Sequence, residues 1–126
     1  MSYETNHLFI YGTLKRGDVR APLLNGQHFI GDVRTEPSYR LFDTGEYPAL
    51  VEAEPLGLVA RSIRGELWKV DAACLVRLDL EEGLDEGLYA RQSIKLLGRR
   101  QIAMGYLYLL PIDGMADCGD SWDMTC

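Results

Sequence analysis

Short apolar runs separated by glycine, proline and acidic residues form the main pattern of this chain. The first run, Leu8-Phe9-Ile10, leads through Tyr11 into Gly12, which predicts a buried strand that enters a tight turn. Further strands are predicted over 27–33, 39–42, 47–51, 64–70, 89–97 and 102–110. The tail from Pro111 is acidic and is predicted to be irregular.

Only one long helix is predicted. Asp71 is a suitable N-cap, residues 72–82 are good helix formers, and Gly83 is a typical helix-ending residue. A single helical turn is predicted at Ala21–Leu24, where Pro22 fits an early helical position. Many short strands with one good helix and no regular alternation indicate an α+β fold, with a mixed or antiparallel sheet that could curl into a small β-barrel.

Three acids lie near the end of this helix, and helical spacing helps to decide which one faces the core. The apolar arc is expected to contain four residues: Leu75, Val76, Leu78 and Leu80. At about 100° per residue, Glu82 falls between Leu78 and Leu75 on the core side. Glu81 falls outside the arc, whereas Asp79 lies beside Leu75 and remains an alternative to Glu82.

Glu82 is therefore the sharpest candidate for chemistry. Loss of water would raise the pKa of its carboxyl, and the negative end of the helix dipole would act in the same direction. A carboxyl tuned in this way can both accept and donate a proton near neutral pH. The alternative is a helix that frays at Gly83 and leaves Glu82 in water.

Composition narrows the class of protein. The 126 residues are 47% hydrophobic and 25% charged, which fits one domain over 1–126 with a real core. A net charge of −6 argues against nucleic-acid binding, because a basic face is needed to offset phosphate charge. No apolar run approaches the ~20 residues that cross a bilayer, and the first residues do not resemble a signal peptide. A cytoplasmic protein without a membrane partner is expected.

The cysteine pattern supports no metal site. Cys74, Cys118 and Cys126 are widely spaced, and no CxxC motif or Cys/His cluster is present, so neither zinc binding nor a disulfide framework is predicted. The two histidines, His7 and His28, show no patterned relation to a cysteine. A nucleophilic thiol needs a basic partner, so a catalytic cysteine is disfavoured.

Five pieces in a fixed order give the chain a family resemblance. They are Leu8-Phe9-Ile10-Tyr11-Gly12-Thr13-Leu14-Lys15-Arg16-Gly17, Tyr47-Pro48-Ala49-Leu50-Val51, Arg64-Gly65-Glu66-Leu67-Trp68-Lys69-Val70, Leu78-Asp79-Leu80-Glu81-Glu82-Gly83 with Tyr89-Ala90-Arg91, and Gly119-Asp120-Ser121-Trp122. Together they resemble the gamma-glutamylcyclotransferase-like family, especially its gamma-glutamylamine cyclotransferase type and small bacterial relatives. The first piece alone is a moderately specific sign of this family, and the five pieces in the same order are a strongly specific one.

The resemblance implies a small β-barrel flanked by helices, with a cavity for a small gamma-glutamyl substrate. It implies that the backbone of Tyr11, Gly12, Thr13 and Leu14 holds the glutamyl group, and that Glu82 is the general acid and base. The implied reaction needs no cofactor: the α-amine attacks the γ-carbonyl, and 5-oxoproline and a free amine or amino acid are released.

Two other functions stay open at this point. The fold could serve a non-catalytic module that binds a small carboxylate, since fold alone does not establish turnover. Phosphate binding by the segment from Gly12 to Gly17 is a weaker alternative, because the Gly-Lys-Ser/Thr ending of a phosphate-binding loop is missing. The identity of the leaving amine and the oligomeric state do not follow from the sequence.

Overall fold

A computed structural model describes residues 6–12, 21–99 and 102–122. Its strands are β1 (Asn6–Ile10), β2 (His28–Arg34), β3 (Tyr39–Asp43), β4 (Pro48–Glu52), β5 (Arg64–Val70), β6 (Tyr89–Ile94), β7 (Ala103–Tyr108) and β8 (Ala116–Gly119). Its helices are α1 (Ala72–Glu81) and the short 3₁₀ turns η1 (Ala21–Leu24), η2 (Glu54–Leu56) and η3 (Leu84–Glu86). The predicted helix and strands therefore form, with ends shifted by a few residues.

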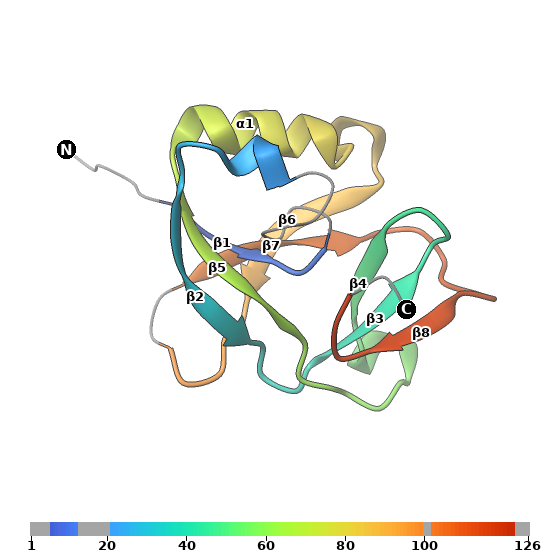
Figure 1. The fold of residues 1–126 in the computed structure, drawn as a ribbon. Helices are drawn as coiled ribbons and strands as arrows, with labels where there is room; N and C mark the ends of the chain where they lie inside the picture. Colours follow the sequence, from blue (N-terminus) through green and yellow to red (C-terminus); the bar gives the residue numbers. More distant parts are fainter. Residues whose placement is uncertain (1–5, 13–20, 100–101, 123–126) are drawn as a thin grey trace.

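The described strands make two sheets, which confirms the α+β class. The larger sheet has the order β2-β5-β1-β7-β6 and is mixed, because β1 runs parallel to β7 and antiparallel to β5. The smaller sheet has the order β4-β3-β8 and lies beside one end of the larger sheet (Figure 1). The prediction of a β-barrel is wrong, because the two sheets do not close into one. An isolated bridge between Thr35 and Leu96 lies just beyond β2 and β6, the edge strands of the larger sheet.

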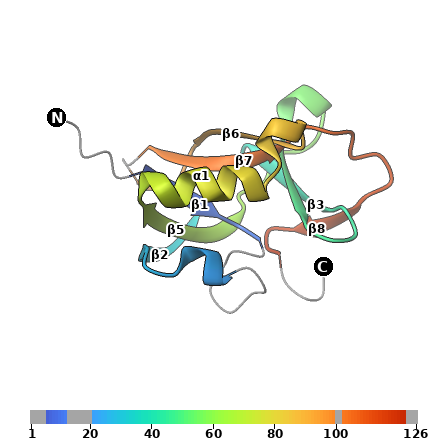
Figure 2. The same ribbon diagram turned by 90° about the horizontal axis from the view of Figure 1, so that it is seen from above.

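Strand β1 is the central element of the fold because it is buried on both faces. Phe9 packs with residues of β3, β5, β6 and β7 on one face, whereas Leu8 and Ile10 pack on the other face against residues of α1 and η1. Figure 2 shows α1 lying across the middle of the larger sheet, above β1. A strand covered on both sides reads as a continuous apolar run, and this is the pattern of Leu8-Phe9-Ile10.

Local signals fix the ends of α1 as predicted. The Asp71 carboxylate accepts a hydrogen bond from the Cys74 backbone N–H at 2.7 Å, and this bond helps to lower the pKa of Asp71. Gly83, with φ of 68°, follows the helix in the left-handed region, where glycine is favoured.

The C-terminal tail departs from the prediction. Residues 116–119 form β8, which pairs antiparallel with β3, instead of an irregular segment. Cys118 is joined in a disulfide, whereas Cys74 is free and lies on the buried side of α1. The expectation of no disulfide was therefore wrong for the tail.

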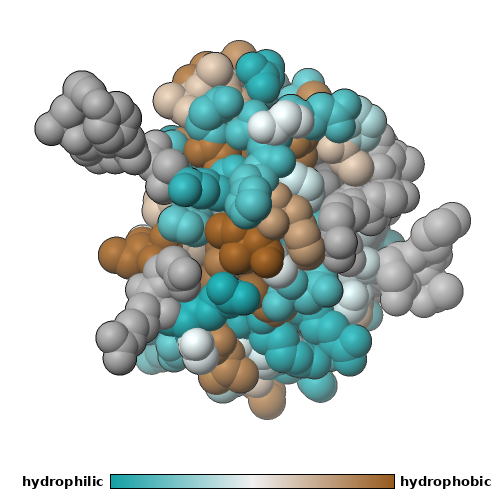
Figure 3. Space-filling view, turned by 60° about the vertical axis from the view of Figure 1, so that its left-hand side comes forward, coloured by the Kyte–Doolittle hydropathy of each residue, from teal (hydrophilic) through white to brown (hydrophobic). Residues whose placement is uncertain are grey.

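Large exposed apolar side chains are spread over several elements. They are Leu56, Val59, Val76, Leu80, Leu97, Ile102, Leu109 and Leu110. Figure 3 shows hydrophobic and hydrophilic residues interspersed on one face of the molecule. Isolated exposed apolar residues are normal on soluble proteins.

Candidate active site

Glu82 is the C-cap of α1 and lies on the core side of the helix, as the helical spacing predicted. Its backbone N–H donates to the Leu78 carbonyl at 2.9 Å, so the residue keeps helical register. Glu82 is only 9% exposed, whereas its neighbour Glu81 is exposed. The alternative of a frayed, solvated Glu82 is therefore wrong.

The covered face of α1 is narrower than the predicted arc. Val76 and Leu80 are 60% and 63% exposed, although both were expected to face the core. The buried side chains are Cys74, Leu75 and Leu78. The buried arc of α1 is therefore shifted toward Cys74 relative to the predicted one. Glu82 lies within the buried arc, between Leu78 and Leu75, as the helical spacing predicted.

Tyr11 follows β1 and turns its side chain into the core. Its ring stacks near Phe9, with centroids 6.0 Å apart, and its hydroxyl donates to the Tyr106 carbonyl at 2.5 Å. The side chain is thus occupied in packing, so only the backbone of Tyr11 is left for binding a ligand. Of the other predicted substrate-binding residues, Gly12 is described, while Thr13 and Leu14 lie outside the described residues.

Gly12 is buried against the start of β4. A Cβ atom at this position would overlap the Cγ atom of Pro48, so a side chain here would push the two strands apart. Gly12 does not have a positive φ. The sequence analysis placed a tight turn at this glycine, but what the fold requires is its missing side chain.

Two tyrosines lie near the same place: Tyr47, which precedes β4, and Tyr89 on β6. The Tyr89 hydroxyl donates to the Pro48 carbonyl at 2.5 Å, and the rings of Tyr47 and Tyr89 lie 6.0 Å apart. Burial raises the pKa of Tyr47, with smaller contributions from Tyr108, Glu46 and Glu82. Glu82 is thus among the charges that raise the pKa of Tyr47.

Asp79, the alternative to Glu82, is held by two partners. Arg91 on β6 donates from Nε to Oδ1 at 2.9 Å and from Nη2 to Oδ2 at 3.2 Å. The Tyr106 hydroxyl on β7 donates to Oδ1 at 2.8 Å. We call Asp79, Arg91 and Tyr106 the Asp79 cluster. Both oxygens of Asp79 are engaged, so this carboxylate is less suited to proton transfer than Glu82.

The sequence analysis did not predict the partners in the Asp79 cluster. Arg91 was named only as part of a family motif, and Tyr106 only fell within a predicted strand, 102–110. The available signal was the pattern of β6 and β7, which pair Arg91 directly with Tyr106. Knowing that α1 lies over this pair requires the tertiary arrangement.

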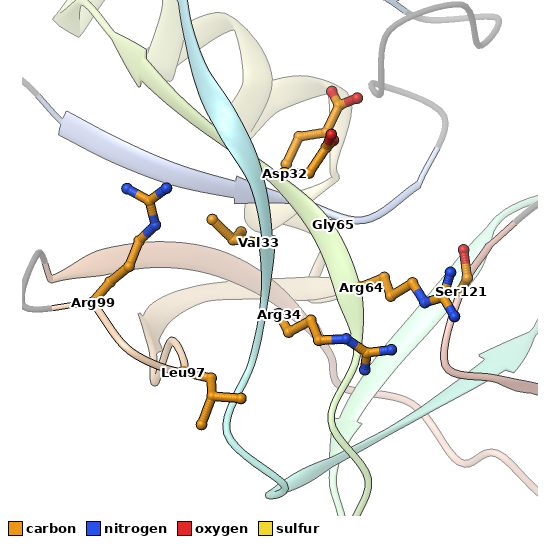
Figure 4. A pocket seen from close by; sticks show the side chains of 9 residues that line it. Asp32, Val33, Arg34, Arg64, Gly65, Leu97, Arg99 and Ser121 are labelled. Carbon is orange, nitrogen blue, oxygen red and sulfur yellow. The ribbon is translucent and has the colours of Figure 1, made fainter.

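A second polar region lies on β2 and β5, away from α1. An open pocket of about 680 Å³ is lined by Asp32, Val33, Arg34, Arg64, Gly65, Glu66, Leu97, Arg99 and Ser121. Figure 4 shows Arg34 and Arg64 extending toward Ser121, with Arg99 on the other side of β2. Arg34 and Arg64 both pair with Asp120, at 3.0 and 3.1 Å. We call Arg34, Arg64 and Asp120 the Asp120 cluster.

The described residues contain no group of three or more His, Cys, Asp and Glu residues that could hold a metal ion. Within the same part of the chain, no helix is long and apolar enough to cross a membrane.

Comparison with known proteins gives a consistent family match. The family model described as "Gamma-glutamyl cyclotransferase, AIG2-like" matches residues 8–123. A Vibrio cholerae serotype O1 protein named "Putative gamma-glutamylcyclotransferase" is 37% identical over 88 residues, which are 70% of each chain. A Methanocaldococcus jannaschii protein of the same description is 28% identical over 121 residues, covering 93% of this chain and 96% of the relative.

Solved structures share the fold. The mouse AIG2-like protein superposes with a TM-score of 0.80 at 24% identity, covering 96% of this chain and 90% of the mouse chain. The Escherichia coli protein ytfP gives a TM-score of 0.69 at 27% identity, covering 94% of this chain and 97% of that chain.

Proposed function

Because the chain belongs to the gamma-glutamyl cyclotransferase, AIG2-like family, we propose that it is a gamma-glutamylcyclotransferase. It acts on a small gamma-glutamyl compound and releases 5-oxoproline together with a free amine or amino acid. Glu82 is the general acid and base, and the backbone of Tyr11, Gly12, Thr13 and Leu14 binds the glutamyl group. No cofactor takes part.

In this reaction the α-amino nitrogen of the substrate bonds to the γ-carbonyl carbon, and the bond from that carbon to the leaving nitrogen breaks. The α-ammonium gives up two protons, and the leaving amine gains two. Glu82 takes a proton from the α-ammonium and returns one to the leaving nitrogen. Because nucleophile and carbonyl belong to one molecule, holding the substrate folded supplies much of the rate enhancement.

The single observation that carries the proposal is the burial of Glu82 at the end of α1. Its charge acts on Tyr47 and on Tyr106. Tyr47 precedes Pro48, which lies against Gly12, and the Tyr106 carbonyl accepts a hydrogen bond from Tyr11. A carboxyl withdrawn from water beside the predicted glutamyl site supports proton transfer there. Asp79 is the weaker candidate, since Arg91 and Tyr106 occupy its oxygens.

The direct test measures 5-oxoproline release by the purified chain across a panel of gamma-glutamyl amines and gamma-glutamyl amino acids. Glu82→Gln should reduce kcat/KM by about 10²- to 10⁴-fold, the range of general acid–base catalysis. Thermal stability should change little, because the amide keeps the size of the side chain. Glu81→Gln is the matched control, since Glu81 lies on the same helix and is exposed.

Full turnover by Glu82→Gln would overturn the assigned role of Glu82. Saturable binding of gamma-glutamyl compounds by the wild-type chain, with no 5-oxoproline release, would instead favour the non-catalytic carboxylate-binding module.

A further inference from the structure

Asp79 and Arg91 form a partly buried ion pair one helical turn from Glu82. The guanidinium meets both carboxylate oxygens, at 2.9 and 3.2 Å, and the two side chains are 22% and 28% exposed. Bidentate pairs of this kind combine charge with a fixed geometry. Arg91 therefore fixes the orientation of Asp79 as well as offsetting its charge.

Tyr106 connects this pair to the segment that follows β1. Its hydroxyl donates to Asp79 at 2.8 Å on the α1 side of the sheet, and its backbone carbonyl accepts from the Tyr11 hydroxyl at 2.5 Å. Tyr106 is 2% exposed. Its bond from Tyr11 is buried, and its bond to Asp79 is partly buried. The Asp79 cluster thus ties the last turn of α1 to the side chain of Tyr11, the residue that precedes Gly12.

Glu82 lies within electrostatic reach of the same cluster. Residues three apart on a helix are neighbours, with Cβ atoms about 5–6 Å from each other, which places Asp79 beside Glu82. Burial raises the pKa of Tyr106, and the hydrogen bond and charge of Asp79 and the charge of Glu82 raise it further, while Arg91 lowers it. The pKa of the Tyr106 hydroxyl therefore depends on the charges of Asp79, Glu82 and Arg91.

We propose that Asp79 and Arg91 are positioning residues that set the proton affinity and the orientation of Glu82. The predicted effects on kcat rest on the proposed function, whereas the predicted effects on the pKa of Glu82 do not. Arg91 cancels the charge of Asp79, so Glu82 experiences little net charge from the pair. Removing either partner alone leaves an unbalanced charge beside Glu82, and the two removals have opposite signs.

Several other groups face the end of α1 and must be held constant in the comparison. Tyr106 faces it from β7 and Tyr47 from the start of β4. Tyr108 and Glu46 act on Tyr47 in turn. None of these groups is changed in the variants that follow, so a difference between variants reports on the Asp79–Arg91 pair.

The experiment uses Asp79→Asn, Arg91→Gln and the double variant. The pKa of Glu82 is measured by ¹³C NMR titration of its side-chain carboxyl, alongside the pH dependence of kcat/KM. Asp79→Asn leaves Arg91 unbalanced and should lower the pKa of Glu82 by about half to one pH unit. Arg91→Gln should raise it by a similar amount, and the double variant should return it close to the wild-type value.

Arg91→Lys separates charge from geometry. It keeps the positive charge but not the planar fork, so the pKa of Glu82 should stay close to that of the wild-type chain. The value of kcat should fall about tenfold or more, because Asp79 and the last helical turn lose their fixed orientation, while KM changes less. Glu81→Gln is the control for removal of an exposed charge and should shift neither the pKa nor kcat.

Equal pKa values of Glu82 in all variants, or shifts of the same sign in both single variants, would overturn the inference. The titration needs no turnover, so it stands even if the chain releases no 5-oxoproline from any compound. Failure of the proposed function and failure of this inference are thereby distinguishable. If one single variant does not fold, the other is compared with Arg91→Lys, which retains the net charge of the pair. A shift of the expected sign in the single variant, with none in Arg91→Lys, supports the inference, and no shift in the single variant overturns it.

Discussion

The Asp79 cluster and the Asp120 cluster are each centred on an aspartate, but their partners and their exposure to water differ. Asp79 contacts one arginine and a tyrosine, whereas Asp120 contacts two arginines. In each, one aspartate bridges two partners. Asp79 and Arg91 are 22% and 28% exposed, and the third partner, Tyr106, is 2% exposed. In the Asp120 cluster the side chains of Arg34, Asp120 and Arg64 are 40%, 40% and 62% exposed.

The difference shows that the exposure of a cluster to water, more than the number of its hydrogen bonds and ion pairs, decides how rigidly it holds its side chains. Water and salt weaken exposed pairs, so the Asp120 cluster adds little rigidity to the open pocket on β2 and β5. Around Asp79 the partners are largely withdrawn from water, and leaving one of them unpaired is costly. The rigid cluster lies beside Glu82, where geometry matters for proton transfer.

The largest expected contrast is in stability. Asp79→Ala should lower the free energy of unfolding by about 2–4 kcal/mol, because Arg91 and the Tyr106 hydroxyl lose their acceptor in a poorly hydrated place. Asp120→Ala should lower it by less than about 1 kcal/mol, since its partners remain accessible to water. Urea unfolding of both variants measures the difference. Equal losses would contradict the contrast drawn between the clusters.

Alkaline pH should sharpen the contrast. The pKa of Tyr106 is raised, first by burial and then by Asp79, so above about pH 10 the unfolded chain loses the phenolic proton while the folded chain keeps it. The unfolded state then binds fewer protons, and stability falls as pH rises, by up to about 1.4 kcal/mol per pH unit. Below pH 10 this dependence is absent.

Tyr106→Phe should flatten that slope when unfolding is measured between pH 10 and pH 11.5. Part of the slope should persist, since the pKa values of Tyr39 and Tyr47 are also raised by burial. Asp120→Asn, the control in the other cluster, should leave the slope as it is in the wild-type chain. A slope unchanged by Tyr106→Phe would show that this hydroxyl ionises normally.

Salt should produce the smallest effect. Raising NaCl from about 0.05 to 1 M shortens the Debye length from more than 10 Å to about 3 Å. The stability difference between wild type and Asp120→Asn, a few tenths of a kcal/mol at low salt, should then disappear. The stability difference between wild type and Asp79→Asn should largely persist at high salt. Its loss would show that the Asp79 cluster is screened by salt in the same way as the exposed Asp120 cluster.

Features set by neighbouring residues could be predicted from the sequence. Asp71 and Gly83 fix the ends of α1 within the chain segment itself, so the helix was predicted to within a residue. The apolar run Leu8-Phe9-Ile10 likewise predicted the central strand. Helical spacing was sufficient to direct Glu82 toward the core, because that prediction required only its angle relative to Leu75 and Leu78.

Features that depend on distant partners could not be predicted. The strand β8 exists because it pairs with β3, and the local sequence from Pro111 contains no comparable signal. Val76 and Leu80 are apolar but exposed, and periodicity does not reveal which apolar residues another element covers. The requirement for glycine at position 12 comes from Pro48, and the role of Arg91 comes from Asp79.

The position of β1 between β5 and β7 has a consequence for biosynthesis. Strand β1 is translated before both of its partners, and one of its two edges has no partner until β7 (Ala103–Tyr108) has been translated. The hydrogen bond from Tyr11 to Tyr106 joins residues 95 positions apart, and such long-range contacts slow folding. A nascent chain that stops before Ala103 would expose an unpaired apolar strand edge, which favours aggregation, so the larger sheet can be completed only after β7 has been translated.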